Sequence, residues 1–218
     1  MSPRLIGERQ WRPWLGPVLG ASVIAVLGVA FVTTSLHQPE VAVFAPTPMA
    51  PPEAGHVLVG PTVYTVDATD ADHWRRFSFR LGAVVDDATP VDWDLAFRRF
   101  QIIANGGAAF LGRGGLIDLG PTPFDSIGSV PSAGYQPNEG RSDPRNPAIA
   151  RWYRYGFFSH LLTPKPNVWA VRTADERYAK LQILSYYCPG PRPGCFTFRY
   201  VYQGDGSTVV ALPGTGRP

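Results

Sequence analysis

RYAKLQILSYYCPGPRPGCFTFRYVYQ, residues 177–203, consists of two alternating segments joined by a stretch rich in Pro and Gly. In the first segment Ala179, Leu181 and Ile183 recur at every second residue, which is the period of a strand with one buried face. The second segment places four aromatic residues on one face: Phe196, Phe198, Tyr200 and Tyr202. The stretch therefore predicts a β-hairpin with one largely aromatic face.

Further segments of the same kind precede this hairpin, and turn residues separate them. They are VYTVDA (63–68), WRRFSFRLGAVV (74–85), VDWDLAFRRFQIIAN (91–105), RWYRYGFFSHLL (151–162) and VWAVRTA (168–174). Residues 106–150 are rich in Gly and Pro and show little regular periodicity. Strands joined by short turns, without a convincing soluble helix, predict an all-β domain that is an antiparallel β-sandwich or a strongly curved sheet.

The chain has only two cysteines, Cys188 and Cys195, and both lie in CPGPRPGC between the hairpin strands. A zinc site would need more ligands than this segment offers, and redox motifs usually separate their cysteines by about two residues rather than the six found here. In an oxidising compartment the pair would form a disulfide across the hairpin connection. The segment then becomes a rigid tip that presents Arg192 outward, and we hypothesise that Arg192 contacts a partner.

The compartment is predicted from the N-terminus. Residues 13–36 carry no charge and are long enough to span a hydrocarbon core of about 30 Å. Arg4, Arg9 and Arg12 precede them, and this excess of positive charge predicts a cytoplasmic N-terminus. A cleaved signal peptide ending near Gly28-Val29-Ala30 is the alternative, although the apolar run is longer than the apolar h-region of a usual signal peptide. We therefore expect an anchor in a bacterial inner membrane, with the following domain in the periplasm.

These signals divide the chain into five parts. They are a short cytoplasmic N-terminus (1–13), a transmembrane helix (14–36), a Pro-rich extended tether (37–61), a periplasmic β-domain (62–212) and a C-terminal tail (213–218). The helix carries Gly16, Gly20 and Gly28 at a spacing that lets a second helix approach closely. Glycine is also common in membrane helices, so a packing stripe and ordinary composition both remain open as interpretations.

Composition and motifs argue against nucleic-acid binding and against catalysis. The formal net charge is only +3, and no run of Lys and Arg resembles a nucleic-acid footprint. The sequence contains no Gly-x-Ser-x-Gly elbow, no phosphate loop and no paired Cys-x-x-Cys. We therefore expect no nucleic-acid partner and no enzymatic activity.

The best metal candidate is DATDAD, which contains Asp67, Asp70 and Asp72. Alternating carboxylates on a loop can hold Ca²⁺. The segment lacks the glycine and the distal Glu of an EF-hand loop, and clusters of Asp and Thr commonly form turns. Calcium is therefore a weak candidate, and we expect no other metal.

A second acidic motif, DWD, contains Asp92 and Asp94 at a spacing that places both on one face of a strand. Such a pair could act as an acid and a base. Arg98 and Arg99 follow closely, however, so structural ion pairing is the favoured interpretation.

The domain resembles the HmuY-like family of bacterial haem-binding proteins in the stretches VDATDADHWRRFSF, VDWDLAFRRFQIIANGG, VRTADERYAKLQILSYY and FTFRYVYQ. The resemblance covers roughly residues 63–203 and implies an all-β, hand-shaped fold. It also implies a haem gripped between loops by two axial ligands, His or Met, from the middle of the domain. Between Asn105 and Asn167 the only such residue is His160, the one weak haem candidate. Three tyrosines could supply an oxygen ligand: Tyr135, Tyr153 and Tyr155.

Two functional hypotheses follow. The first is a non-catalytic accessory subunit of a bacterial membrane protein complex, with its helix in the lipid bilayer and its β-domain docked on the periplasmic face. Energy-transducing assemblies, such as photosynthetic reaction-centre or respiratory complexes, and transport machinery are candidate hosts. The second is a membrane-tethered protein that binds haem or another tetrapyrrole. The missing catalytic residues and haem ligands favour the first, which predicts no cofactor.

Overall fold

The computed structural model describes residues 14–36, 40–48, 58–86 and 89–211. The expected N-terminal segment 1–13, the tail 213–218 and residues 37–39 and 49–57 of the expected tether lie outside these ranges. By its contacts the chain divides into two units. The first contains the N-terminal helix together with residues 157–160, and the second contains the β-domain.

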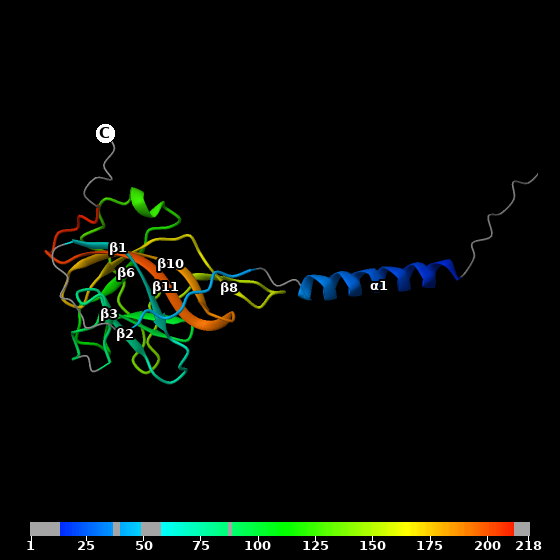
Figure 1. Ribbon diagram of the computed structural model, residues 1–218, viewed down its shortest axis with the longest axis horizontal. Coiled ribbons are helices and arrows are strands. Elements are labelled where there is room, and N and C mark those ends of the chain that lie inside the picture. Colours follow the sequence, from blue (N-terminus) through cyan, green and yellow to red (C-terminus); the bar gives the residue numbers. More distant parts are fainter. Residues whose placement is uncertain (1–13, 37–39, 49–57, 87–88, 212–218) are drawn as a thin grey trace, which may run out of the picture. The chain divides into compact units, whose positions relative to one another are not determined.

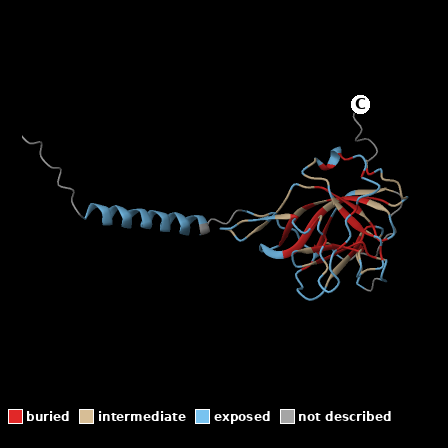
Figure 2. Ribbon diagram, turned by 180° about the vertical axis from the view of Figure 1, so that it is seen from behind, coloured by how far each residue is buried: buried red, intermediate tan, exposed pale blue. Residues whose placement is uncertain are grey.

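The N-terminal element is α1 (Leu15–Leu36), a single helix of 22 residues. Within it, Leu15–Thr34 has a mean hydropathy of 2.3, and none of this window is buried inside the protein. Figure 1 shows α1 as one continuous helix, and Figure 2 colours its described residues as exposed. A helix that is apolar on all sides is suited to a hydrocarbon environment, because its backbone polar groups are all paired within the helix. The structure thus confirms an N-terminal apolar helix long enough to cross a membrane.

The larger sheet of the β-domain has the strand order β1-β11-β10-β9-β6, and all neighbouring strands are antiparallel. Its strands are β1 (Leu58–Asp67), β6 (Gly115–Asp118), β9 (Trp169–Arg172), β10 (Tyr178–Cys188) and β11 (Arg192–Gln203). The hairpin predicted at 177–203 supplies the long strands at the middle of this sheet, where Leu181 lies opposite Tyr200 and Ile183 opposite Phe198. The hairpin predicted from residues 177–203 therefore forms the middle of the larger sheet.

The smaller sheet has the order β3-β2-β4-β5, and a separate two-stranded hairpin joins β7 to β8. These elements are β2 (Arg75–Ser78), β3 (Ala83–Val84), β4 (Leu95–Arg98), β5 (Gln101–Ala104), β7 (Tyr153–Tyr155) and β8 (Leu162–Pro164), and a short 3₁₀ helix, η1 (Phe124–Ser126), follows β6. Segments 74–85, 91–105 and 151–162, each predicted as one strand, are hairpins instead. Their apolar residues continue through the turns, so alternation alone does not reveal the reversal.

The hydrophobic core lies between the two sheets and is mainly aromatic. Figure 2 shows that much of the strand backbone belongs to buried residues. Phe198 of β11 is fully buried, and its ring centroid is 5.2 Å from that of Phe77 and 5.5 Å from that of Phe97 in the smaller sheet. Phe79 meets Tyr200 at 5.2 Å. Edge-to-face and stacked pairs at such separations add to the stability that burial provides. The predicted antiparallel all-β sandwich is confirmed.

A second apolar cluster covers the outer face of the larger sheet, which the alternation pattern predicts to be polar. It consists of Phe124, Ile127, Val130, Tyr135, Val168, Ala170, Val201 and Val210. Lys180 points into this layer, where its Nζ donates to the carbonyl oxygens of Phe124 at 2.9 Å and Ile127 at 2.8 Å. Burial lowers the pKa of the Lys180 ammonium. This lysine therefore ties η1 to the sheet.

Part of the segment expected to be a free tether lies against the β-domain. Val43 forms a parallel bridge with Tyr187, and the N–H of Phe44 donates to the carbonyl oxygen of Tyr187 at 3.0 Å. Further along, the N–H of Thr47 donates to the carbonyl oxygen of Thr65 at 2.9 Å. β1 also begins at Leu58, four residues before the expected boundary at 62. Residues 41–48 and 58–61 thus belong to the β-domain and not to an extended spacer.

Cys188 and Cys195 form the expected disulfide, with their Cα atoms 4.9 Å apart. The strands run through the predicted connection, since Tyr187 pairs with Pro193 and Cys188 with Arg192. The turn is therefore limited to residues 189–191. Arg192 is exposed at the first position of β11, where it can be reached from solvent.

Removing this disulfide should destabilise the domain moderately. We expect the Cys188→Ala, Cys195→Ala double variant to lose roughly 1–3 kcal/mol, because the loop is short and its prolines already restrict the unfolded chain. Chemical denaturation of the full-length protein in detergent measures this change. An unchanged midpoint in the double variant would contradict it.

Candidate functional site

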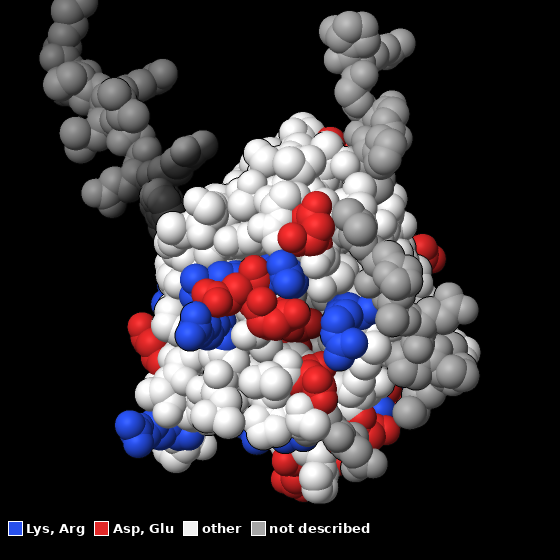
Figure 3. Space-filling view, turned by 90° about the vertical axis from the view of Figure 1, so that its left-hand side faces the viewer, with Lys and Arg blue, Asp and Glu red and all other residues white. Residues whose placement is uncertain are grey.

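Charged side chains on the β-domain are mixed in sign. Figure 3 shows one face on which Lys and Arg lie directly beside Asp and Glu in a central group, with further charged side chains of both signs around it. Ion pairs on this domain include Arg75 with Asp86 at 3.0 Å and Arg113 with Glu176 at 3.0 Å. Mixed charges of this kind do not produce the single-sign field that attracts a nucleic acid.

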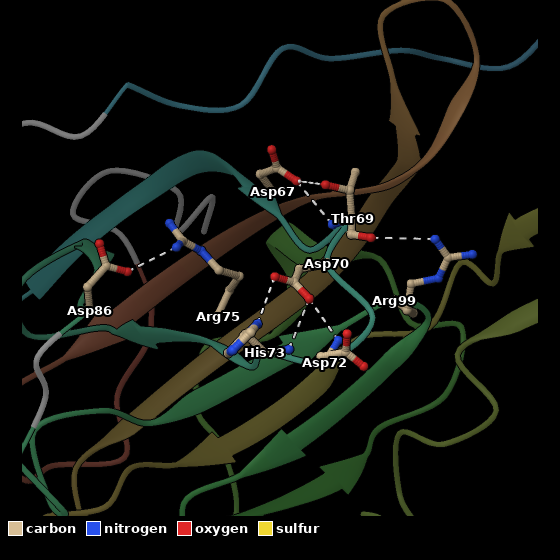
Figure 4. A network of polar contacts seen from close by, with 8 residues as sticks. All are labelled: Asp67, Thr69, Asp70, Asp72, His73, Arg75, Asp86 and Arg99. Atoms are coloured by element: carbon tan, nitrogen blue, oxygen red, sulfur yellow. Dashed lines mark hydrogen bonds and ion pairs between the residues drawn. The ribbon is translucent and has the colours of Figure 1, made fainter.

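The DATDAD segment forms the turn between β1 and β2, and its carboxylates bind the turn itself (Figure 4). Asp67 accepts hydrogen bonds from the backbone N–H of Thr69 at 3.0 Å and from its hydroxyl at 2.6 Å. Asp70 accepts from the N–H of Asp72 at 2.7 Å and contacts the ring Nδ1 of His73 at 2.9 Å. The N–H of Asp72, followed by the His73 ring, lowers the pKa of the Asp70 carboxyl.

These contacts leave the proposed calcium ligands apart rather than convergent. Asp67 and Asp70 each close a turn of their own, which is the usual role of Asp in such clusters. Within the described part of the chain, no group of three or more His, Cys, Asp or Glu side chains is arranged to hold a metal ion. An open pocket of about 700 Å³ lies beside this turn, and Arg75 and Asp86 line its other side.

The two carboxylates of DWD have different surroundings. Asp92 accepts the hydroxyl of Thr89 at 2.6 Å and lies 3.7 Å from Arg80. Asp94 is buried and accepts two backbone N–H groups, from Phe79 at 2.8 Å and from Ala174 at 3.0 Å. Burial raises the pKa of the Asp94 carboxyl to about 7, against the opposing effect of the two N–H donors. Asp94 therefore links the β2–β3 turn to the β9–β10 turn.

The expected ion pairs between this motif and Arg98 or Arg99 are replaced by other contacts. The Arg98 guanidinium lies 4.4 Å from the ring centroid of Trp74. Arg99 has a φ of 51° in the tight turn between β4 and β5, and its guanidinium donates to the carbonyl oxygen of Thr69 at 3.4 Å. The turn sends Arg99 away from DWD, which the sequence spacing does not reveal.

One ligand-like feature is an aromatic groove on the outer face of the smaller sheet. Two adjoining hollows of about 210 and 420 Å³ share Arg76, Trp93, Ala109 and Phe110, and Trp74 and Arg141 line the smaller one. The Trp93 and Phe110 rings meet edge to face at 5.5 Å, and Arg76 lies 5.8 Å from the Trp93 ring centroid. Apolar walls with a few charged groups are typical of sites for flat organic anions.

The described residues of this groove do not provide the two-sided haem ligation of the resemblance. No His, Met, Cys or Tyr occurs among the described residues that line either hollow. His160 lies exposed in the β7–β8 connection with a φ of 55°, and it lines neither hollow. His73 contacts Asp70 at the β1–β2 turn. A haem held by two axial His or Met ligands therefore does not fit here.

The three candidate tyrosines also serve other contacts. The Tyr135 hydroxyl donates to the carbonyl oxygen of Pro131 at 2.7 Å, and burial raises the pKa of that hydroxyl. Tyr153 packs against Trp152 at 5.0 Å. Tyr155 is 55% exposed at the end of β7. The structure therefore does not bring them together as a ligand set.

Solved structures share this architecture. An apo HmuY analogue of Tannerella forsythia has a TM-score of 0.54 and 17% identity, covering 69% of this chain and 100% of that one. Apo PinO of Porphyromonas gingivitis has a TM-score of 0.53 and 16% identity, covering 66% of this chain and 97% of that one. A HmuY-like protein of Bacteroides vulgatus, for which haem is the expected ligand, has a TM-score of 0.53 and 20% identity, covering 65% and 91%.

These likenesses define the class as all-β proteins with the HmuY-like fold. A sequence profile described as HmuY protein matches residues 70–200, and the chain therefore belongs to the HmuY family. A comparison with curated proteins gives no match. The family resemblance inferred from the sequence is thus confirmed, while the residues that act in this chain must be argued from its own structure.

Proposed function

We propose that the protein is a single-pass, membrane-anchored and non-catalytic accessory subunit of a bacterial membrane protein complex. The observation that carries the proposal is α1, whose apolar span Leu15–Thr34 has no buried part within the protein. The side chains of such a helix contact lipid or other membrane-spanning helices. Photosynthetic reaction-centre and respiratory complexes are candidate hosts, because such assemblies contain helices that a single-pass subunit can join.

The direction of insertion is part of the proposal. Arg4, Arg9 and Arg12 precede α1, which favours a cytoplasmic N-terminus and a periplasmic β-domain in the inner membrane. The disulfide between Cys188 and Cys195 supports the same arrangement, because such bonds persist in oxidising compartments.

A non-catalytic role is supported by how the polar groups are used. The carboxylates that resemble a metal or acid–base site bind backbone N–H groups of their own turns, as at Asp70, or join two turns, as at Asp94. The groove around Trp93 has cationic and aromatic groups but no nucleophile and base in contact among its described lining residues. A surface that recognises a partner needs no more than this.

The small residues Gly16, Gly20 and Gly28 of α1 supply a direct test of the proposal. Apart from the neighbouring backbone of α1 itself, a Cβ added at Gly16 or Gly20 would meet no heavy atom of the described chain within 4 Å. We therefore expect the Gly16→Leu, Gly20→Leu double variant to fold normally and to co-purify with its complex roughly tenfold less well, since close helix packing is lost. The measurement is the amount of complex recovered with the tagged chain from mildly solubilised native membranes.

Ser22→Leu is the matched control for this experiment. At about 100° per residue Ser22 lies about 120° around the helix from Gly16 and from Gly28 and about 160° from Gly20, and hence faces away from all three glycines. This variant should keep the wild-type recovery. Equal recovery of the glycine double variant and the wild type would show that Gly16 and Gly20 do not pack against a partner helix, and it would count against the proposal.

The alternative function is binding of haem or another tetrapyrrole. It is favoured by the family and by the aromatic groove, whose Trp93 and Phe110 rings and Arg76 suit a flat anionic molecule. Because no His, Met, Cys or Tyr lies among the described residues that line the groove, our account expects no sharp Soret shift when haem is titrated into the full-length protein in detergent. A shift at sub-micromolar haem would favour the alternative. A His160→Asn variant, which tolerates positive φ, would then tell ligation by His160 from stacking in the groove.

A further inference from the structure

The connection between β7 and β8 is a second feature, besides α1, that suits contact with a membrane. We call Gly156–Leu161 the aromatic loop. Phe157 is 75% exposed and Phe158 is 57% exposed, while Tyr155 just before the loop is 55% exposed. Three large aromatic side chains in four consecutive positions form an apolar patch that water does not favour.

The loop is held in shape rather than loosely attached. The N–H of Gly156 donates to the carbonyl oxygen of Leu161 at 2.8 Å and closes the turn. At the base of the hairpin the N–H of Leu162 donates to the hydroxyl of Tyr187 at 2.7 Å. The indole N–H of the buried Trp152 donates to the carbonyl oxygen of Phe100 at 2.9 Å. The phenylalanines are therefore presented on a fixed support, so that little ordering is needed when they bind.

The charges around the loop suit an anionic surface. Residues 151–167 contain Arg151, Arg154 and Lys165 but no Asp or Glu. Arg151 and Arg154 are exposed, and each lies within a few residues of the phenylalanines. Aromatic rings flanked by basic side chains are typical of segments that sit at the headgroup level of a bilayer. The exposed rings and this charge pattern together favour an anionic lipid surface over a basic or a purely apolar surface.

An independent contact places Phe158 against the membrane span. In the unit formed by α1 and residues 157–160, the Phe158 ring packs edge to face on Phe31, with centroids 6.2 Å apart. Phe31 lies three residues before Thr34, the end of the apolar span. At 1.5 Å per residue this position is about 5 Å from the end of the span, near the boundary between hydrocarbon and headgroups.

We propose that the aromatic loop inserts Phe157 and Phe158 into the headgroup region of the bilayer, as a second and interfacial attachment beside α1. This inference rests on the anchoring part of the proposed function and does not need the complex. It assigns the loop, including the exposed His160, to lipid contact rather than to haem ligation. Its ligand is a lipid surface, with a preference for anionic headgroups.

A fluorescent probe on the loop tests this inference. Because both native cysteines are in the disulfide, Phe158→Cys supplies one reactive thiol for an environment-sensitive dye. Leu111→Cys, at a position that is 76% exposed in another loop, is the control. In the full-length protein reconstituted into vesicles of phosphatidylcholine and phosphatidylglycerol, we expect lipid-borne shallow quenchers to act about twice as strongly at position 158 as at position 111.

The outcomes separate the two proposals. The loop assignment is overturned if iodide still quenches the dye at position 158 and lipid-borne quenchers act on it no more strongly than on the control. This holds even if the chain stays in the vesicles. Protection that appears only in native membranes, and not in pure lipid, also overturns it, because a protein then covers the loop. Release of the full chain from vesicles by carbonate instead overturns the anchoring by α1.

Discussion

The Phe198→Ala variant should lose about 3–5 kcal/mol of unfolding free energy, since it removes a large buried ring from a packed core. Phe198 is fully buried, and its ring meets both Phe77 and Phe97 of the opposite sheet. The substitution therefore takes away the contact that holds the two sheets together and leaves a cavity between them. Denaturation of the full-length protein in detergent, followed by near-ultraviolet circular dichroism, reports the loss.

Phe157→Ala is the matched control, because it makes the same chemical change at a side chain that is 75% exposed. We expect it to change the unfolding free energy by no more than about 0.5 kcal/mol. If the two variants were equally stable, the aromatic layer between the sheets would not be the core of the domain.

Asp94 should make the domain less stable as the pH rises from about 4 to about 7. The pKa of its carboxyl is raised from 3.8 to about 7 in the folded protein, so between these values the folded state binds a proton that the unfolded state releases. The stabilisation that the protonated Asp94 carboxyl provides is fully present when the pH is below the pKa of this group in the unfolded protein. It is lost as the pH rises through the pKa of the group in the folded protein. The loss is on the order of 2–4 kcal/mol.

The measurement is the unfolding free energy as a function of pH for three proteins. Asp94→Asn should be less dependent on pH over this range than the wild type, because the titrating group is gone. Asp92→Asn, which changes the neighbouring carboxylate of the same motif, should keep the wild-type slope. A wild-type slope in the Asp94 variant would show that other groups produce the dependence.

The fold was predictable from the sequence where alternation and turn residues agree. The β10–β11 hairpin and its disulfide follow from the period of the aromatic residues and from the position of the two cysteines. The hairpin at 91–105 was missed because its turn carries Arg and Phe in place of Gly or Asn, and Arg99 itself takes positive φ. The hairpins at 74–85 and 151–162 contain Gly82 and Gly156, but the apolar residues around these single glycines hide the turns. β6 was missed because it is short and lies in a region rich in Gly.

The candidate sites were less predictable, because they depend on contacts between distant segments. Phe110 reaches Trp93 from a loop without periodicity, and only the folded chain brings them together. Asp94 was expected to pair with arginine but instead binds N–H groups from two separate turns. Residues 41–48 read as a spacer by their prolines, yet their backbone pairs with β10 and β1. Local sequence carries no signal for these long-range contacts.

The central claim is that this chain works as a subunit within a larger membrane assembly. The most direct measurement is the mass of the tagged protein released from its native membranes by mild detergent, determined by light scattering on the purified particle. Our account predicts a discrete particle in which the chain is present at a fixed ratio to other integral membrane proteins. A particle that contains only this chain and its detergent, found in more than one mild detergent, would contradict the claim.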